Sequence, residues 1–217
     1  MTSYTFPIDI DAVDTTRSGA YGLLIRHGAR EPITADTNMF GAQLTEEGRA
    51  QAKALGARLQ GRRPHGFYAS PVKRCIDTNL CILEGLGMVG EEARMTVKPH
   101  SVLGEAFMTD PDVGKASFGL KKPEQLVLDY LDGESVPGFG TIERGARIIL
   151  DFVRANIVPG TFSVFITHDA LVMPFRQHFL GDRWSSENWG PPLGGCVIYT
   201  EENRTWINGR IIPSKNP

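Results

Sequence analysis

The sequence predicts an α/β fold of three layers, in which helices cover both faces of a mainly parallel central sheet. Short apolar runs that fit buried strands alternate along the chain with longer segments whose apolar residues recur at helical spacing. Strands that alternate with helices in this way favour a parallel sheet, because each parallel pair needs a crossover connection. Two of these apolar runs, at 21–25 and 161–167, lead directly into histidine-containing motifs.

The individual elements follow from local patterns and from start and stop signals. In chain order, these predict a strand at 21–25, a helix over 45–60, a strand at 66–70, a helix over 71–86, a strand at 94–99, helices over 123–131 and 141–157, a strand and a helix within 161–181, and a hairpin over 194–209. Thr45 is the expected N-cap of the first helix, and Pro71 is expected at the first position of the second. Gly181 should end the last helix, and Glu202 and Asn203 should join the two strands of the hairpin.

Length and composition predict one soluble domain. The 217 residues can bury a substantial core, and 41% hydrophobic with 22% charged residues is typical of soluble globular proteins. No apolar run approaches the roughly 20 residues that a membrane span needs, and residues 1–20 lack the features of a signal peptide, so we expect a cytoplasmic protein. A net charge of −2 argues against a nucleic-acid surface, and we expect no membrane partner either.

Three cysteines, Cys75, Cys81 and Cys196, are an odd number and lack the spacing of a metal site. Two of them lie within one predicted helix. We therefore expect buried free thiols rather than a redox or metal function.

Several predicted strands end in residues that carry chemistry. In chain order, the candidates at these strand ends are Arg26, His27, Arg30, Ser70, Arg74, His168 and Asp169. Ligands of such sheets bind beyond the carboxyl ends of the strands, so we expect these side chains to converge. The rigid donor forks of three arginines fit a phosphate group better than a carboxylate. The sequence thus predicts a phosphate site in which a histidine is held against the bound phosphoryl group.

Four stretches, "LLIRHGAREP", "LTEEGRAQAKALGARL", "YASPVKRCIDT" and "ITHDALV", together resemble the histidine phosphatase superfamily, which includes cofactor-dependent phosphoglycerate mutase and the histidine acid phosphatases. The resemblance spans about residues 21 to 200. It implies a phosphoglycerate mutase-like fold and a single histidine phosphatase domain over 1–217. Within that domain, 1–20 would be an N-terminal extension and 104–122, which has mixed polarity and turn residues, an insertion that covers the pocket.

The resemblance also implies roles for the clustered residues. His27 would be the nucleophile that becomes phosphorylated, and Arg26, Arg74 and His168 would complete the phosphate pocket. Arg30 fits the acid phosphatase branch, in which a second arginine also holds phosphate. A neutral histidine attacks through one ring nitrogen while the other donates its proton to an acceptor. Because guanidinium groups supply the positive charge, we expect neither a metal nor another cofactor.

Two carboxyl groups are candidates for the acid that protonates the leaving group. Asp169 directly follows the second histidine, as in the acid phosphatase branch. The chain has the small size of the mutase branch, which takes its acid from a glutamate elsewhere, and Glu105 in "VLGEAF" lies close to that place. Adjacency to His168 at one strand end favours Asp169, although an aspartate there is also a common helix N-cap.

The expected activity is hydrolysis of a phosphomonoester of a small organic molecule through a phosphohistidine on His27. Two alternatives remain open: a protein that binds a phosphorylated ligand without turnover, and a mutase-type phosphotransferase. The mutase would need additional basic residues, and the segment after Glu105 offers only Lys115 before Lys121. The expected partner is a small phosphorylated metabolite, while its identity and the oligomeric state stay open.

Apolar side chains should form the mouth of this pocket. The candidates are Met39 and Phe40 within 32–43, Phe107, Met108 and Phe118 within 104–120, and Trp184 or Trp189. An apolar rim predicts an organic group beyond the phosphate.

Overall fold

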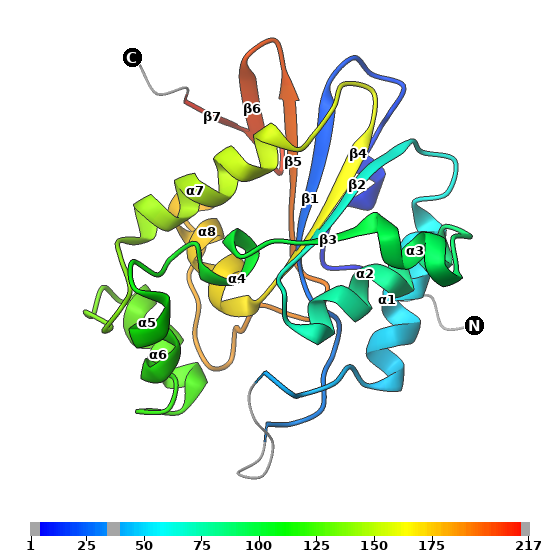
Figure 1. Cartoon of the computed structure of the whole chain (residues 1–217). Helices are drawn as coiled ribbons and strands as arrows, with labels where there is room; N and C mark the ends of the chain where they lie inside the picture. Colours follow the sequence, from blue (N-terminus) through cyan, green and yellow to red (C-terminus); the bar gives the residue numbers. More distant parts are fainter. Residues whose placement is uncertain (1–4, 34–39, 214–217) are drawn as a thin grey trace.

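A computed structural model describes residues 5–33 and 40–213 of the chain (Figure 1). Its elements in chain order are the 3-10 helix η1 (Ile10–Ala12), β1 (Ala20–Arg26), α1 (Glu46–Arg58), β2 (Pro64–Ala69), α2 (Lys73–Gly85), α3 (Gly90–Thr96), β3 (Val97–Pro99), α4 (Val102–Glu105), α5 (Pro111–Ser117), α6 (Pro123–Leu131), α7 (Ile142–Ala155), β4 (Phe162–Thr167), α8 (Asp169–Leu180), β5 (Gly195–Glu201), β6 (Arg204–Ile207) and β7 (Arg210–Ile212). The predicted alternation of strands and helices is confirmed.

The described strands form one seven-stranded sheet in the order β3-β2-β4-β1-β5-β6-β7. β1, β2, β3 and β4 pair in parallel, whereas β5, β6 and β7 add an antiparallel part at one side. The α/β class is therefore as predicted, but the sheet is mixed rather than mainly parallel. The reason is the C-terminal meander, because strands joined by tight turns can only run antiparallel. Glu202 and Asn203 form the first of these turns in the left-handed conformation that such a hairpin needs.

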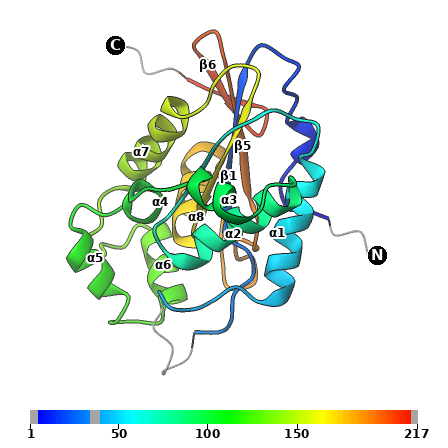
Figure 2. The ribbon, with the colours of Figure 1, turned by 45° about the vertical axis from the view of Figure 1, so that its right-hand side comes forward.

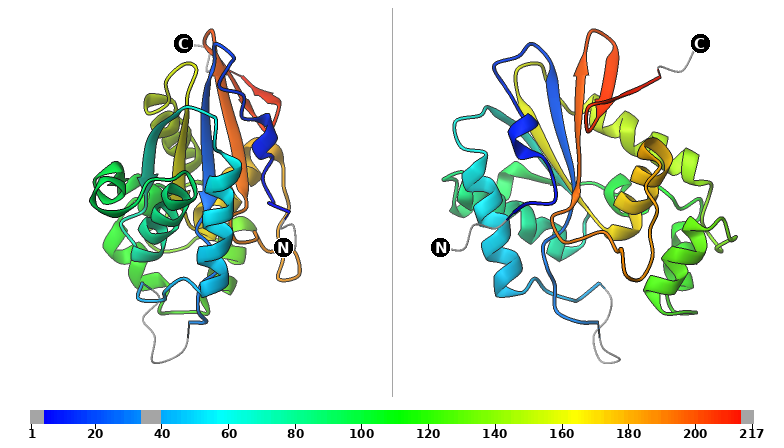
Figure 3. Two further views of the ribbon diagram at one scale, coloured as in Figure 1. Left: turned by 90° about the vertical axis from the view of Figure 1, so that its right-hand side faces the viewer. Right: turned by 180° about the vertical axis from the view of Figure 1, so that it is seen from behind.

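Helices cover both faces of the sheet. α1, α2 and α3 lie on one face, and α4 to α8 lie on the other (Figures 1 and 3). Along β1, Tyr21, Leu23 and Ile25 pack into the core with α1 and α2, while Leu24 packs into the opposite core with α7 and α8. Every residue of β1 is buried, as the uninterrupted apolar run predicts for a strand covered on both faces.

Most predicted helix ends agree with the structure. The Thr45 hydroxyl accepts a hydrogen bond from the Gly48 amide at 3.0 Å and caps α1. Gly181 ends α8 with φ 78°, a conformation in which glycine avoids the penalty of a Cβ. α2 begins two residues later than predicted, because Val72 keeps an extended backbone and is its N-cap. Pro71 therefore lies before the helix and not at its first position.

The segments around the third parallel strand differ more from the prediction. Residues 94–96 end helix α3, so β3 contains only Val97–Pro99 at the edge of the sheet. Residues 104–122, expected to be irregular, contain the end of α4 and all of α5. Figure 2 shows α4, α5 and α6 gathered on one side of the molecule. Within the described residues, no helix combines the length and the apolar character that a membrane span requires.

The cysteines agree with the prediction. Cys75, Cys81 and Cys196 are all free and buried. Burial raises the pKa of the Cys196 thiol to about 12, so the reactive thiolate is disfavoured there.

Candidate active site

The strand ends converge on a cavity of about 550 Å³, within the usual size of small-molecule sites. The predicted site residues that line it are Arg26, His27, Arg30, Arg74, Glu105, His168 and Asp169. The structure thus brings all of these candidates together. The parallel pairing of β1, β2 and β4 explains this arrangement, because it places their carboxyl ends along one edge of the sheet.

His27 follows β1 directly and is 1% exposed. Its Nδ1–H donates to the Gly28 carbonyl at 2.8 Å, and its Nε2 accepts from Arg74 Nε at 3.0 Å. These two contacts fit the neutral tautomer with its proton on Nδ1. Burial, with a contribution from nearby Arg74, lowers the pKa of His27 to about 3. His27 is thus a neutral imidazole whose lone pair lies on the side of the arginine.

The backbone after His27 is packed tightly against α1 and α2. A Cβ on Gly28 would lie 2.9 Å from the Gly48 carbonyl oxygen, so a larger residue would push α1 away from the loop. The Gly28 amide donates to Thr78 Oγ1 at 3.1 Å, and that hydroxyl donates to the Arg74 carbonyl at 2.7 Å. Thr78 therefore fixes the loop that carries His27 relative to the helix that carries Arg74.

Arg74 lies in the first turn of α2 and contacts both histidines. Besides His27, it has His168 Nδ1 within 3.2 Å of its Nη2. Burial lowers the pKa of the Arg74 guanidinium, and the positive charges of Arg30 and Arg26 lower it further. An anion bound between these groups would relieve their mutual repulsion.

Arg26, the last residue of β1, is held from two sides. Its Nη2 pairs with Asp169 Oδ2 at 2.8 Å, and its Nη1 donates to the Gly190 carbonyl. Its Nε is buried and has no hydrogen-bond partner among residues 5–33 and 40–213. A buried donor without a partner is costly.

Arg30 lies in the loop after His27 and also lines the cavity. Its Nη1 donates to the Glu31 carbonyl at 3.0 Å. The charge of Arg30 contributes to the lowered pKa of both Arg26 and Arg74, so the three guanidinium groups form one local cluster of positive charge.

His168 directly follows β4 and is the N-cap of α8. Its Nε2 lies 2.9 Å from Ser70 Oγ, at the end of β2, and its ring centroid lies 5.5 Å from that of His27. Burial lowers the pKa of His168 well below its usual value, and Arg74 lowers it further. A neutral ring that accepts from Arg74 at Nδ1 can donate from Nε2 to Ser70.

The Asp169 carboxylate is held by three contacts within the protein. Besides the ion pair with Arg26, it accepts from Trp189 Nε1 at 3.0 Å and from the Ala170 amide at 2.9 Å. Burial by itself would raise the pKa of Asp169, but the Arg26 charge and these hydrogen bonds outweigh it and hold that pKa well below its usual range. Asp169 is therefore an ionised group that orients Arg26, and it is not the N-cap of α8.

Glu105 is the last residue of α4 and reaches the cavity from the opposite side. Its Oε1 pairs with Lys115 Nζ of α5 at 2.5 Å, and its side chain is 29% exposed. A partly exposed ion pair of this kind contributes little stability. Unlike Asp169, Glu105 is not held by the phosphate-facing arginines in any contact that the described residues make.

The expected mouth residues divide between the cavity and its surroundings. Phe40, Phe107, Met108, Phe118 and Trp189 line the cavity. Met39 lies outside the described residues, and Trp184 lines a neighbouring hollow, where its Nε1 donates to the Met173 carbonyl.

Sequence reasoning missed several further lining residues, among them Glu124 and Phe139. Glu124 lies in the first turn of α6, where glutamate is common in any helix, so nothing in the sequence singled it out. Phe139 lies in the loop before α7 and reaches the cavity only through its pairing with Met108. Within the described part of the chain, no group of three His, Cys, Asp or Glu residues could hold a metal ion.

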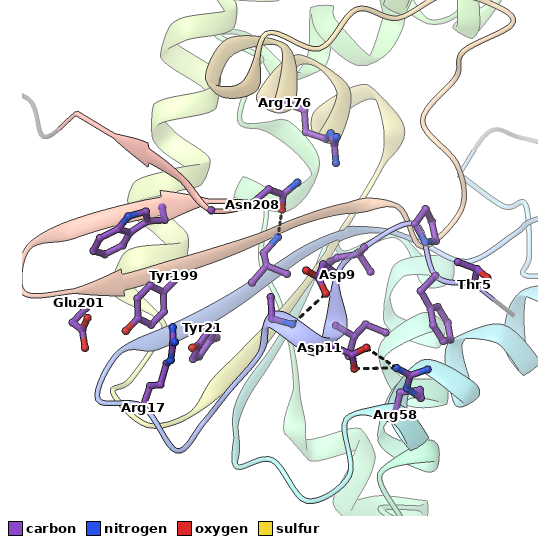
Figure 4. Close-up of a pocket in the computed structure, with 18 of the residues that line it drawn as sticks. Thr5, Asp9, Asp11, Arg17, Tyr21, Arg58, Arg176, Tyr199, Glu201 and Asn208 are labelled. Atoms are coloured by element: carbon purple, nitrogen blue, oxygen red, sulfur yellow. Dashed lines mark hydrogen bonds and ion pairs between the residues drawn. The ribbon is translucent and has the colours of Figure 1, made fainter. Parts of the chain in front are cut away.

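A larger hollow of about 1230 Å³ lies between the N-terminal segment and strands β5 and β6 (Figure 4). Asp11 pairs there with Arg58 at 2.9 Å, and the rings of Tyr21 and Tyr199 are tilted by 38° with 4.8 Å between their centroids. No histidine or cysteine of the described chain lines this hollow. The cavity at the strand ends is therefore the better candidate for chemistry.

Comparison with known proteins agrees with this choice. Residues 23–108 match the family model of the histidine phosphatase superfamily (branch 1). The match includes His27, Arg74 and Glu105 and ends before the motif of His168 and Asp169. No curated protein sequence matches the chain significantly.

Solved structures show a similar fold at low sequence identity. A phosphoglycerate mutase from Bacillus anthracis str. Sterne is 14% identical with a TM-score of 0.59, and the alignment covers 89% of this chain and 93% of that one. A mycobacterial glucosyl-3-phosphoglycerate phosphatase is 18% identical with a TM-score of 0.52, and the alignment covers 83% of this chain and 89% of that one. A phosphoserine phosphatase from Entamoeba histolytica is 18% identical with a TM-score of 0.52, and the alignment covers 86% of this chain and 94% of that one. The predicted phosphoglycerate mutase-like fold is confirmed.

Proposed function

Because residues 23–108 match the family model of the histidine phosphatase superfamily (branch 1), we propose that the protein hydrolyses a phosphomonoester of a small organic molecule through a phosphohistidine on His27. One observation carries the proposal: His27 is buried, neutral and directed through Nε2 at Arg74, within a cluster of three arginines. Nucleophilic attack on phosphorus needs such a lone pair, and the arginines offer the charge that the phosphoryl oxygens need. Phosphatases among the proteins of similar fold support the same reading.

Binding of the substrate would place phosphoryl oxygens among Arg26, Arg30 and Arg74. The Arg74 Nε–H that now contacts His27 is one donor to them. When an oxygen takes over that Arg74 donor, the lone pair of His27 is free to face phosphorus. Charged donors already in position stabilise the charge on the transferred group without further reorganisation.

In the first step, His27 Nε2 forms a bond to phosphorus as the bond from phosphorus to the alcohol oxygen breaks. The ring gains positive charge, and its Nδ1–H is already donated to the Gly28 carbonyl. That hydrogen bond stabilises the phosphorylated imidazole and keeps the ring oriented. His168 acts indirectly, because its contacts with Arg74 and Ser70 position the guanidinium.

The leaving oxygen needs a proton, and the contacts favour Glu105 over Asp169 as its source. Asp169 is held ionised by Arg26 and Trp189. Glu105 has one exposed partner, Lys115, for which an incoming phosphate dianion competes. In the second step, the Glu105 carboxylate takes a proton from the water that attacks phosphorus. The bond between His27 and phosphorus then breaks and inorganic phosphate is released.

The proposal is tested by phosphate release from p-nitrophenyl phosphate in the presence of a chelator. The wild type should release phosphate, and His27→Ala should release none. His65→Ala, which truncates an exposed histidine, is the matched control and should keep the wild-type rate. Tight binding of inorganic phosphate without turnover of any phosphomonoester would instead indicate a ligand-binding protein and would overturn the proposed hydrolysis.

A further inference from the structure

Besides its charged residues, the cavity at the strand ends has a largely apolar wall. Its wall comes from four separate segments of the chain, namely the region of α4 and α5, helix α6, the loop before α7 and the loop before β5. The side chains that dominate it are Phe107, Met108, Phe118, Val127, Phe139 and Trp189. Apolar walls with few convergent polar groups are typical of sites for organic ligands.

This apolar wall is anchored to the core. Phe139 lies 6.0 Å from Phe118 and 5.1 Å from Tyr130, measured between ring centroids. Tyr130 in turn contacts Phe107 and donates through its hydroxyl to the Gly140 carbonyl at 2.9 Å. Met108 pairs with Phe139 through a β-bridge. A wall that is already ordered loses little conformational entropy when a ligand binds to it.

The charges around the mouth disfavour a second acidic group on the substrate. Lys115 pairs with Glu105 at 2.5 Å, and Lys73 pairs with Asp77 at 2.6 Å. Besides the three arginines of the phosphate site, these two lysines line the cavity, and each is paired with a carboxylate. Glu124 adds a further carboxylate to the lining, and its charge is close enough to influence Arg26. A substrate carboxylate would therefore meet the like charges of Glu105 and Glu124 and would have to displace a carboxylate from either lysine.

We propose that the physiological substrate is the phosphomonoester of an uncharged, apolar alcohol, aliphatic or aromatic, which lies against this wall. The inference rests on the proposed phosphatase activity and specifies its substrate class. The apolar wall accounts for affinity through burial of the alcohol carbons, and the cavity carboxylates exclude phosphorylated acids. Small polar phosphate esters would bind by their phosphate group alone.

A series of n-alkyl phosphates from ethyl to hexyl phosphate tests the inference. The leaving groups of this series are chemically alike, so the change in kcat/KM measures contact with the wall rather than bond reactivity. Each added methylene should raise kcat/KM by about two- to fourfold, the upper value corresponding to full burial at about 0.8 kcal/mol per methylene. Hexyl phosphate should exceed 3-phosphoglycerate by more than an order of magnitude.

A charge placed in the wall makes the test specific. Met108→Lys should flatten the dependence on chain length and raise the relative kcat/KM for 3-phosphoglycerate, because it adds a cation to the apolar surface. Met108→Leu should retain the wild-type pattern. Met95→Lys introduces the same charge at a residue that is 77% exposed on α3 and should change neither property.

The outcomes separate the two proposals. If p-nitrophenyl phosphate and the alkyl phosphates all fail to release phosphate, the proposed function is wrong. If they release phosphate with no dependence on chain length, or if 3-phosphoglycerate is the best substrate of the series, the phosphatase function stands and the apolar substrate class is wrong.

Discussion

Replacement of Asp169 by Asn tests how this carboxylate and Glu105 divide their roles. Asn has nearly the same volume and can still accept from Trp189, but it lacks the charge that pairs with Arg26. The two paired side chains are only 11% and 19% exposed, with 2.8 Å between Nη2 and Oδ2. If Asp169 orients Arg26, the substitution should weaken every substrate alike. If Asp169 is the acid, the substitution should slow mainly the hydrolysis of substrates whose leaving group needs a proton.

The magnitude follows from the burial of the pair. At 2.8 Å and an effective dielectric constant of about 20, the attraction is about 6 kcal/mol before the cost of desolvation is subtracted. Removal of one partner of a buried pair typically lowers the free energy of unfolding by about 3–5 kcal/mol. Because the hydrogen bond to Trp189 is retained, we expect a loss at the lower end of this range, about 3 kcal/mol. A displaced Arg26 should then lower kcat/KM by about 10- to 100-fold.

The assay is kcat/KM for p-nitrophenyl phosphate and for an alkyl phosphate, with urea unfolding as the stability measurement. Asp169→Asn should lose activity by the same factor on both substrates. Glu105→Gln should lose about 10²- to 10⁴-fold on the alkyl phosphate and little on p-nitrophenyl phosphate, whose phenolate leaves with little help. A selective loss on the alkyl phosphate in Asp169→Asn, with Glu105→Gln nearly unaffected, would refute the assignment.

Three further predictions concern phosphate affinity, pH and thiol reactivity. Arg74→Ala should weaken competitive inhibition by vanadate about 10- to 100-fold, since a charged hydrogen bond contributes about 1.5–3 kcal/mol; unchanged inhibition would exclude Arg74 from the pocket. The free energy of unfolding, measured by urea titration, should fall as the pH drops from about 6.5 towards about 3, because unfolded His27 takes up a proton that the folded ring excludes. Its contribution is a slope of about 1.4 kcal/mol per pH unit, and an equally steep profile in His27→Ala would contradict it. Cys75, Cys81 and Cys196 should react with Ellman's reagent only on unfolding, and rapid reaction of the native protein would contradict their burial.

The convergence of the site could be predicted from the sequence because it depends on topology. The runs before His27 and His168 are mostly apolar and rich in large aliphatic and aromatic residues, which indicates strands buried on both faces in the middle of a sheet. The carboxyl ends of neighbouring parallel strands lie together, so the motifs that follow them had to meet. Arg74 follows by the same reasoning, because β2 leads into the first turn of α2.

The environment of each group could not be predicted, because it depends on partners far away in the sequence. Asp169 is adjacent to His168 in the chain, which suggested a catalytic acid, but its charge is fixed by Arg26 of β1 and by Trp189 of the loop before β5. No sequence pattern gives the distance between those three segments. The apolar wall is a similar case, since Phe139 reaches Met108 only through tertiary packing.

Secondary structure was mispredicted where local signals compete with packing. Residues 94–96 contain β-branched and apolar side chains and suggested a strand, yet they end a helix whose Ala93 packs into the core. Tertiary contact outweighs local propensity in such short segments. The third strand of the C-terminal meander, β7, has only three residues and gave no detectable pattern.

The central claim is that His27 carries the phosphoryl group, and it is tested most directly by trapping that intermediate. Wild-type protein mixed with a reactive phosphomonoester, quenched rapidly at alkaline pH and digested should yield a peptide with one phosphoryl group on His27. The label should be lost in acid, as a phosphorus–nitrogen bond is, and should be absent from His27→Ala. A phosphoryl group found on His168 or on a serine, or turnover with full activity in His27→Ala, would contradict the account.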